Sequence, residues 1–328
     1  MCSAQDELIA AVVPRLSRED AEDRGLRMFQ WLEHGPAGAI EATVAELRAN
    51  VPLPTLQERG CATLRKLVTD EAKGAEAGAV GAVEALTAAL QAHPASVEVL
   101  HAACLALSSI ASYGDNRDKA GAAGAVEAAV AVMQAHPANA DVQCAACKAL
   151  CAFAGSCKNR LKAIAAGALE SLVAAMQTHP ANVNVQSAAC QVLKLLSIID
   201  QVKAGEVGGI EAVIAAMRTH PASEEVQSAA CDAFWTIAND ESNKVNAGAV
   251  GAVEAVVTAM LVHRNSFRVQ LDACLALSTL LDGSSSNAAK ARTAGAVEAV
   301  NRAVKTNASS KYFVDKGELV LAALQGMQ

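Results

Sequence analysis

Cysteine and histidine, which commonly bind metals or act in covalent catalysis, recur at regular intervals along this sequence. The recurrence gives a row of cysteines and a row of histidines: Cys61, Cys104, Cys147, Cys190, Cys231 and Cys274; His93, His136, His179, His220 and His263. Equivalent positions of stacked helices lie about 8–10 Å apart, whereas a disulfide needs Cα atoms within about 7 Å and a zinc–nitrogen bond measures about 2 Å. We therefore expect no disulfide ladder and no metal site. The cysteines are interpreted as packing residues. The histidines are interpreted as helix-terminating residues that hydrogen-bond exposed carbonyls, with collective pH sensitivity as the alternative.

A second group of cysteines lies close together in the sequence. Cys144, Cys147 and Cys151 have the i, i+3, i+7 spacing of one helical surface, and Cys157 follows soon after. A structural zinc site commonly takes paired ligands from two short motifs, and no second pair answers these residues. An exposed reactive thiol at Cys144 is a further hypothesis, because the residues at its position in other repeats are mostly polar: His101, Ser187 and Ser228.

No catalytic arrangement emerges from the motifs. The glycines recur with the repeat and lack the lysine and hydroxyl residue of a nucleotide-binding loop, and the serines and histidines match no nucleophile motif. The sequence therefore predicts a protein that is not an enzyme and has no cofactor. The alternative is an enzyme or chaperone that holds a small ligand or cofactor near Cys144, Lys148 and Trp235.

Composition and charge restrict the remaining classes. Of 328 residues, 52% are hydrophobic but only 3% aromatic, so small side chains must build the core. The net charge of −7 and the lack of a basic run disfavour nucleic acid as a partner. No uncharged apolar stretch reaches the roughly 18 residues that a membrane span needs. Ten cysteines without a secretory signal indicate a reducing compartment, so we expect a soluble, cytoplasmic protein.

A tetrapeptide organises the chain. Gly-Ala-Val-Glu or a close variant ends at seven glutamates that lie 41 to 44 residues apart: Glu41, Glu84, Glu127, Glu170, Glu211, Glu254 and Glu298. A period near 42 residues is typical of helical solenoids. The glutamates fall near predicted helix N-termini, where negative charge is favoured. An acidic edge that recruits a basic partner is the alternative.

Each repeat contains three predicted helical segments and no strand-like alternation. Val83, Leu86 and Leu90 have the spacing of one helical face. Pro94 follows His93, so the first helix is expected to end there and another to begin. The second runs through Val99 and Ile110, and a short third segment such as 116–119 returns the chain to the next glycine. A row of methionines six residues after the glutamates reads as packing residues: Met133, Met176, Met217 and Met260.

These repeats resemble the armadillo (ARM) repeat. The resemblance rests on Gly-Ala-Val-Glu-Ala-Leu at 81–86, on Leu-Ala-Leu-Ser at 105–108 and 275–278, and on the Val-Gln pairs that open the second helix at 142, 185, 226 and 269. It implies an all-α, right-handed superhelix. We expect capping helices over residues 1–35, built on Leu8, Ile9, Val12 and Val13, and about seven repeats over 36–328, the last acting as the C-terminal cap. The repeated glutamate replaces a proline that is common in the family.

In armadillo proteins the long helix lines a concave groove, which predicts where a partner would bind. The Trp and Asn pairs with which importin-α-like members hold basic peptides are missing at the matching positions, so a nuclear transport adaptor is disfavoured. The predicted groove residues are His101, Leu105, Ser109, Cys144, Lys148, Gln191, Leu195, Asp232, Trp235, Thr236, Leu275 and Thr279. Leu105, Leu195 and Leu275 are expected to be exposed. Trp235 is the candidate anchor, or else it fills a gap beside Phe234. The main hypothesis is a protein–protein interaction scaffold that binds a peptide or helical segment of another protein without catalysis.

Overall fold

The computed structural model describes residues 18–326, and every regular element within them is an α-helix. The chain divides into two compact units, Met1–Ala128 and Ala129–Gln328, which are described separately here. The predicted all-α repeat fold is confirmed. The predicted cap over residues 1–35 contains α2 (Arg18–Leu32), whereas Leu8, Ile9, Val12 and Val13 lie outside the described residues. The boundary at 35/36 stays a prediction.

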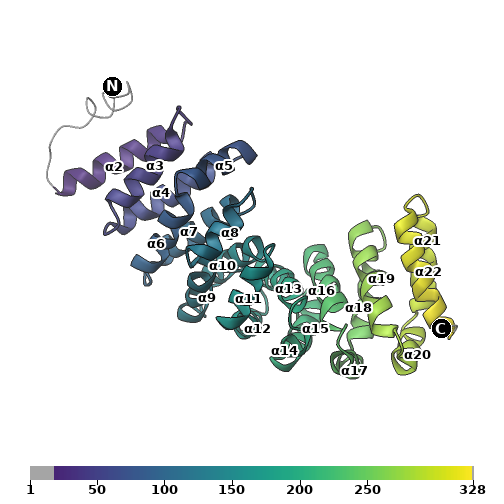
Figure 1. Cartoon of the computed structure of the whole chain (residues 1–328). Helices are drawn as coiled ribbons and strands as arrows, with labels where there is room; N and C mark the ends of the chain where they lie inside the picture. Colours follow the sequence, from purple (N-terminus) through teal and green to yellow (C-terminus); the bar gives the residue numbers. More distant parts are fainter. Residues whose placement is uncertain (1–17, 327–328) are drawn as a thin grey trace. The chain divides into compact units, whose positions relative to one another are not determined.

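Three helices make up a complete repeat, as the sequence predicts, and we call them short, middle and long (Figure 1). In the first unit, α3 (Ala39–Ala49) and α4 (Pro54–Leu67) form a middle and long pair. The next repeat follows as α5 (Glu71–Ala79), α6 (Ala82–Ala92) and α7 (Val97–Ile110). A third begins with α8 (Asn116–Ala122) and continues into α9 (Ala125–Ala135), the helix that contains the boundary between the units.

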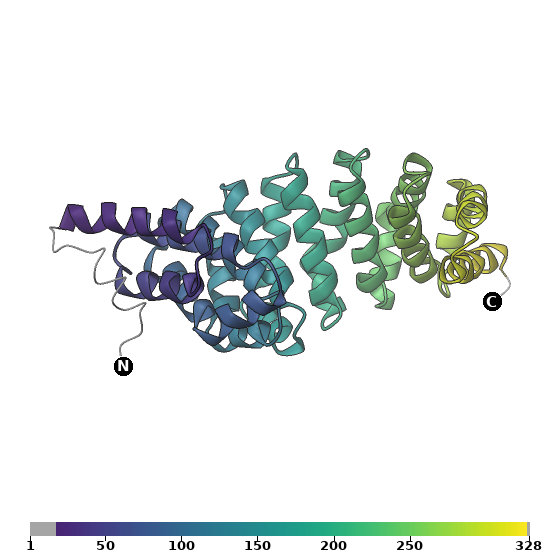
Figure 2. The ribbon, with the colours of Figure 1, turned by 90° about the horizontal axis from the view of Figure 1, so that it is seen from above.

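The second unit starts with the long helix α10 (Ala140–Phe153). Three full repeats follow, each in the order short, middle, long: α11 (Cys157–Ala165), α12 (Ala168–Thr178), α13 (Val183–Ser197); α14 (Gln201–Glu206), α15 (Gly209–Thr219), α16 (Glu224–Ile237); α17 (Glu241–Val250), α18 (Ala252–Val262), α19 (Phe267–Leu281). The last repeat is α20 (Ser285–Thr293), α21 (Ala296–Thr306) and α22 (Lys311–Gln325). Figures 1 and 2 show the long helices α13, α16, α19 and α22 stacked in that order.

Local chemistry sets the helix starts. The middle helices α6, α12 and α15 follow glycines with φ between +81° and +87°, a conformation that L side chains rarely adopt. The repeated glutamates stand in the first turn, as predicted for the helix dipole. Pro94 lies in the turn after α6 and does not begin a helix, because α7 starts after Ser96, whose hydroxyl accepts the amide N–H of Val99.

The cysteine row packs the core, as predicted. Cys190, Cys231 and Cys274 are fully buried free thiols on α13, α16 and α19. Burial raises the pKa of the Cys190 and Cys274 thiols to about 12, since the thiolate is poorly solvated there. The four methionines of the predicted row are buried too.

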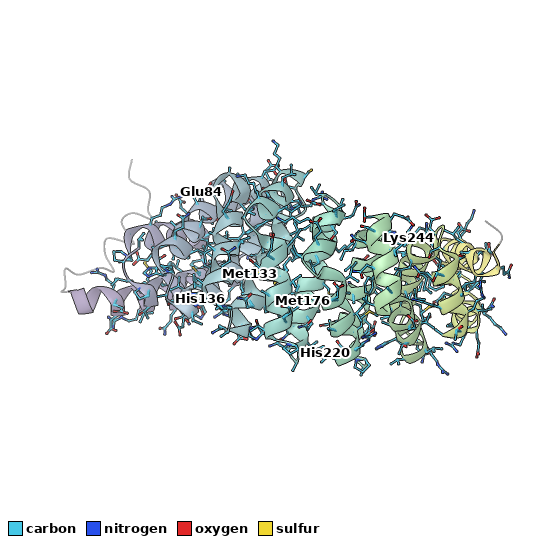
Figure 3. The ribbon with its side chains drawn as sticks, turned by 90° about the horizontal axis from the view of Figure 1, so that it is seen from below. Glu84, Met133, His136, Met176, His220 and Lys244 are labelled. Carbon is cyan, nitrogen blue, oxygen red and sulfur yellow. The ribbon has the colours of Figure 1, made fainter. Side chains whose placement is uncertain are left out.

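The histidines end the middle helices, but their rings bind elsewhere than predicted. His220 closes α15 with its backbone N–H, while its Nε2 donates to the carbonyl of Pro180, one repeat earlier, at 2.7 Å (Figure 3). Equivalent bonds join His179 to Pro137 and His263 to Pro221. The expectation that the ring bonds carbonyls at its own helix end is therefore wrong. The turn after a middle helix thus places a backbone carbonyl within hydrogen-bonding distance of the histidine ring of the next repeat.

A buried glutamine fixes most of the described long helices to the middle helix of their own repeat; α7 and α22 lack it. The Nε2 group of Gln227 donates to the carbonyl of Met217 at 2.8 Å and to that of His220 at 3.0 Å. Gln186 makes the same two bonds to Met176 and His179. These bonds satisfy helix-end carbonyls that packing has removed from water.

A buried asparagine fixes most short helices. Asn287 of α20 donates to the carbonyl of Leu280 at 2.8 Å and to that of Lys244, one repeat earlier, at 3.4 Å. A Cβ added to Gly248 would lie 1.9 Å from the Asn287 Oδ1, so only glycine leaves the asparagine its space. Asn243 and Gly205 repeat this arrangement between α17 and α14.

No single helix among residues 18–326 is both long and apolar enough to cross a membrane. Only α17 and α18 taken together reach that length and composition, and they are bent by 66° at Gly251.

Candidate functional site

The predicted groove residues all lie on long helices. His101, Leu105 and Ser109 are half-buried on α7 in the first unit. In the second unit the exposed Lys148 lies on α10, the exposed Gln191 and half-buried Leu195 on α13, and the half-buried Thr279 on α19. Their membership of a binding groove stays a prediction.

Three exposure expectations are wrong. Leu275 is only 6% exposed, because α19 is packed between α16 and α22. Thr236 is 6% exposed, and its hydroxyl donates to the carbonyl of Ala233 in its own helix. Cys144 is 9% exposed, so the hypothesis of an exposed thiol there fails. The polar residues at the Cys144 position are no sign of exposure, because Ser228 is buried as well.

The exposed face of α13 and α16 carries a compact charged group around Trp235. The Lys194 Nζ lies 2.5 Å from the Asp232 Oδ2 and 5.8 Å from the centroid of the Trp235 ring. The ammonium thus bridges a carboxylate and an aromatic face, which is a cation–π geometry. Trp235 is 37% exposed, so one part of the ring is packed and the rest is open to solvent. The interpretation of Trp235 as only a gap filler does not account for this exposure.

Asp272 on α19 extends this group by one repeat. Its Oδ2 accepts the Ser228 hydroxyl at 2.5 Å, and the Arg268 Nε lies 3.9 Å away. Burial raises the pKa of the Asp272 carboxyl and the charge of Asp232 adds to this rise, although the hydrogen bond from Ser228 opposes it. Two neighbouring carboxylates, Asp232 and Asp272, are therefore flanked by the cations Lys194 and Arg268 across α13, α16 and α19, a pattern suited to holding polar groups of a partner around a central aromatic ring.

The other end of the charged group is a weaker contact. The Cys151 thiol of α10 lies 3.9 Å from the Gln191 Oε1 of α13. Burial raises the pKa of Cys151, and nearby Lys194 only partly offsets the rise. Cys151 is therefore not activated as a nucleophile.

Lys194 and Asp272 were missed by sequence reasoning, and Cys151 was considered only as a metal ligand, although the repeat contains a signal for Lys194 and Cys151. Lys194 and Cys151 both stand four residues after a row cysteine, which is the position of Trp235 in its own repeat. Equivalent positions of neighbouring repeats lie side by side, so the sequence could have predicted that Lys194 and Cys151 lie in one row with Trp235. Asp272 precedes its row cysteine by two residues, a position not followed in the sequence analysis.

A pocket of about 280 Å³ lies between α15 and α18, apart from the charged group. Arg218, Glu254 and Val262 line it, and the Arg218 Nη2 donates to the carbonyl of Val250. Across the described part of the chain, no three His, Cys, Asp or Glu side chains are placed to hold a metal ion.

Stacked three-helix repeats with a long inner helix define an armadillo-type repeat protein. The chain belongs to the armadillo repeat family, since a family model described as LRRK2 ARM repeat matches residues 56–252. No curated protein matches the chain.

Solved structures share the fold. An engineered protein matches with a TM-score of 0.65 and 25% identity, over 74% of this chain and 98% of its own. A designed armadillo repeat protein in complex with the peptide (KR)4 matches with a TM-score of 0.60 and 25% identity, over 74% and 99%. A structure concerned with the interaction between cadherin and beta-catenin has a TM-score of 0.75 at 16% identity, over 95% of this chain and 62% of its own.

Proposed function

We propose that this protein is a non-catalytic interaction scaffold that binds a peptide or helical segment of another protein on the exposed face of α13, α16 and α19. The observation that carries the proposal is the partly exposed Trp235 ring, with the Lys194 ammonium over its face, in a chain with only two tryptophans. The designed armadillo protein in complex with the peptide (KR)4 supports it, because a similar fold there binds a peptide. A cytoplasmic location is also proposed, supported by the free thiols of the described residues.

The charges around Trp235 define what a partner must supply. Asp232 is already paired with Lys194, so a partner that only offers a cation would have to displace that lysine. A large apolar side chain packed on the ring, with polar groups reaching Asp272 and Arg268 at either side, needs no such exchange. Truncating a central tryptophan of this kind typically costs at least about 2 kcal/mol, or about 30-fold in affinity.

The test compares Trp235→Ala with Trp31→Ala. Trp31 on α2 is 50% exposed and belongs to the other unit, so it is a matched control for loss of a surface tryptophan. Both variants and the wild type are used as bait, and captured proteins are quantified by mass spectrometry. We expect one set of partners to be lost with Trp235→Ala and kept with Trp31→Ala, at unchanged far-UV circular dichroism. Identical partner lists for all three baits would contradict the proposal.

A spectroscopic readout makes the same test quantitative. Trp31→Phe leaves Trp235 as the only tryptophan, so its fluorescence reports this face alone. Any partner that binds there must change the emission of Trp235 as it is titrated. A partner that binds tightly without changing it binds elsewhere.

A further inference from the structure

A second surface stands out on the short helices, at the position nine residues before each repeated glutamate. In three consecutive repeats this position holds a large apolar residue that is exposed to solvent: Leu161 at 54%, Val202 at 47% and Val245 at 63%. In other repeats it holds Ala75, Asp118 or Ala289. We call these three residues the apolar row. Because small or charged residues suffice at this position elsewhere, folding alone does not require the apolar row.

Polar contacts to the previous repeat hold two of the helices that carry the apolar row. Directly after Val202, Lys203 pairs with Glu170 of the previous repeat at 3.0 Å. Directly after Val245, the Asn246 side chain donates to Glu211 at 3.0 Å. These contacts hold α14 and α17 against the N-terminus of the middle helix of the previous repeat, and the preceding residues Val202 and Val245 are exposed. The apolar row is therefore a preformed feature and not a set of loose side chains.

The apolar row lies apart from the face that carries Trp235. In Figure 1, α14 and α17 run along the lower edge of the second unit, below the long helices α13, α16 and α19. Figure 3 places Lys244 of α17 near the opposite edge of the unit from His220, so the α17 end of the apolar row is distant from the turn at His220. A ligand of the apolar row would leave Trp235 free.

Charge is distributed unevenly along the apolar row. Helix α11 carries the exposed Lys158 beside Leu161 and has no acidic residue. The next two short helices carry exposed acids: Glu206 on α14, and Glu241 on α17, which is paired with Lys244 at 2.9 Å. A complementary ligand is therefore acidic where it meets Leu161 and basic where it meets Val202 and Val245, mainly because of Glu206.

The spacing and the backbone of the row favour a helical ligand. Stacked helices lie about 8–10 Å apart, and about seven residues of α-helix rise about 10 Å. An extended segment needs partners for its own N–H and C=O groups, whereas the backbone of α11, α14 and α17 is already paired within these helices. An α-helix satisfies its backbone internally and needs only an apolar stripe.

We propose that the apolar row is a second docking site, which binds an amphipathic α-helix of a partner protein with apolar residues at heptad spacing, acidic at the end that meets α11. The site is independent of the face that carries Trp235.

The test uses a synthetic stapled helical peptide of about 20 residues, since unstapled helices of this length are marginal in water. It carries a leucine at every seventh position, acidic residues beside the first leucine and basic residues beside the others. The control peptide has the same composition with its leucines spread around the helix. The protein variant is Leu161→Ala/Val202→Ala/Val245→Ala, which installs the alanine found at this position in other repeats and is expected to fold normally because all three side chains are exposed.

We expect the patterned peptide to bind the full-length protein and the control peptide to bind at least tenfold more weakly. The triple alanine variant should lose at least tenfold in affinity, Lys158→Glu should weaken binding, and Trp235→Ala should leave it unchanged. Equal binding of the two peptides, or unchanged affinity of the triple variant, would overturn the proposal. So would binding to phosphatidylserine vesicles that the triple variant loses, if the patterned peptide does not bind, because the apolar row would then face a lipid surface.

Discussion

Gly248 and Asn287 provide the sharpest test of how neighbouring repeats are joined. A methyl group at Gly248 would lie 1.9 Å from the Asn287 Oδ1, so Gly248→Ala must displace an asparagine that is only 3% exposed. The displaced side chain loses its bonds to the carbonyls of Leu280 and Lys244. The alanine itself is favourable, because Gly248 lies inside α17.

The magnitude follows from these opposing effects. Loss of two hydrogen bonds costs about 1–3 kcal/mol in total, and crowding adds about 1–3 kcal/mol. Better helix propensity returns about 1 kcal/mol. We expect Gly248→Ala to lower the free energy of unfolding by about 1–5 kcal/mol, and Asn287→Ala, which loses the two hydrogen bonds without crowding, to lower it by about 1–3 kcal/mol. In Gly248→Ala/Asn287→Ala the methyl group occupies space that the asparagine has vacated, so the double variant should be no less stable than Asn287→Ala alone.

Urea unfolding followed by far-UV circular dichroism measures the four corners of this cycle. The control is Asn301→Ala, which removes an exposed asparagine whose side chain donates to the carbonyl of Val297 in its own helix, and which should change stability by less than about 0.5 kcal/mol. Additive losses in the double variant would refute the reasoning, because they would mean that the methyl group and the asparagine do not compete for one site.

Other contacts make separate predictions. Gln227→Leu should lower the free energy of unfolding in urea by about 1–3 kcal/mol, because the Met217 and His220 carbonyls lose a buried donor. Gln177→Leu on the surface should lower it by less than about 0.5 kcal/mol, and equal effects would contradict a stabilising role of the buried glutamine. Iodoacetamide at pH 8 should label the exposed Cys157 and spare Cys190 and Cys274, whose pKa values burial raises to about 12, until the chain unfolds; peptide mass spectrometry showing uniform labelling would contradict this. Folding raises the pKa of the Asp272 carboxyl, so the folded protein binds this proton more tightly than the unfolded chain. The free energy of unfolding should therefore fall as the pH rises from the unfolded-state pKa to the folded-state pKa. Asp272→Asn should lack this pH dependence, and parallel pH profiles of wild type and variant would disprove the prediction.

The fold was predictable because it depends on periodic features. The repeated glutamate, the row cysteines and the methionines recur once per repeat, and each keeps one structural role. The direction of side chains between repeats was not predictable, because it depends on which neighbour lies within reach. The ring of His220 bonds Pro180 of the previous repeat, whereas Asn50 in the first repeat bonds the carbonyl of Glu46 in its own helix.

The candidate site was predictable in part for the same reason. Trp235 and Asp232 were found from their positions in the repeat, but their partner Lys194, which occupies the Trp235 position in the previous repeat, was not followed. The predicted exposure failed at Leu275 and Thr236, since equivalent positions of different repeats are buried to different extents by packing. Sequence columns thus predict adjacency well, whereas exposure requires the packed structure.

The chain itself contains a place at which the short-helix asparagine and the glycine that would face it are both missing. The asparagine is missing from the repeat that contains α14. Counting from the row cysteine, Val202 stands where other repeats have Asn116, Asn159 and Asn243; counting from the glutamate, it stands in the apolar row. Val202 fits both positions because the glutamates Glu170 and Glu211 are only 41 residues apart, two fewer than the usual 43. One repeat earlier, the position of Gly205 and Gly248 is occupied by Ile164. Where no asparagine needs the space, the glycine is not kept, which is the compensation that the Gly248→Ala/Asn287→Ala variant imitates. In this shorter repeat Val202 occupies the solvent-facing position between Leu161 and Val245, so the missing buried asparagine and the continuity of the apolar row coincide in one residue.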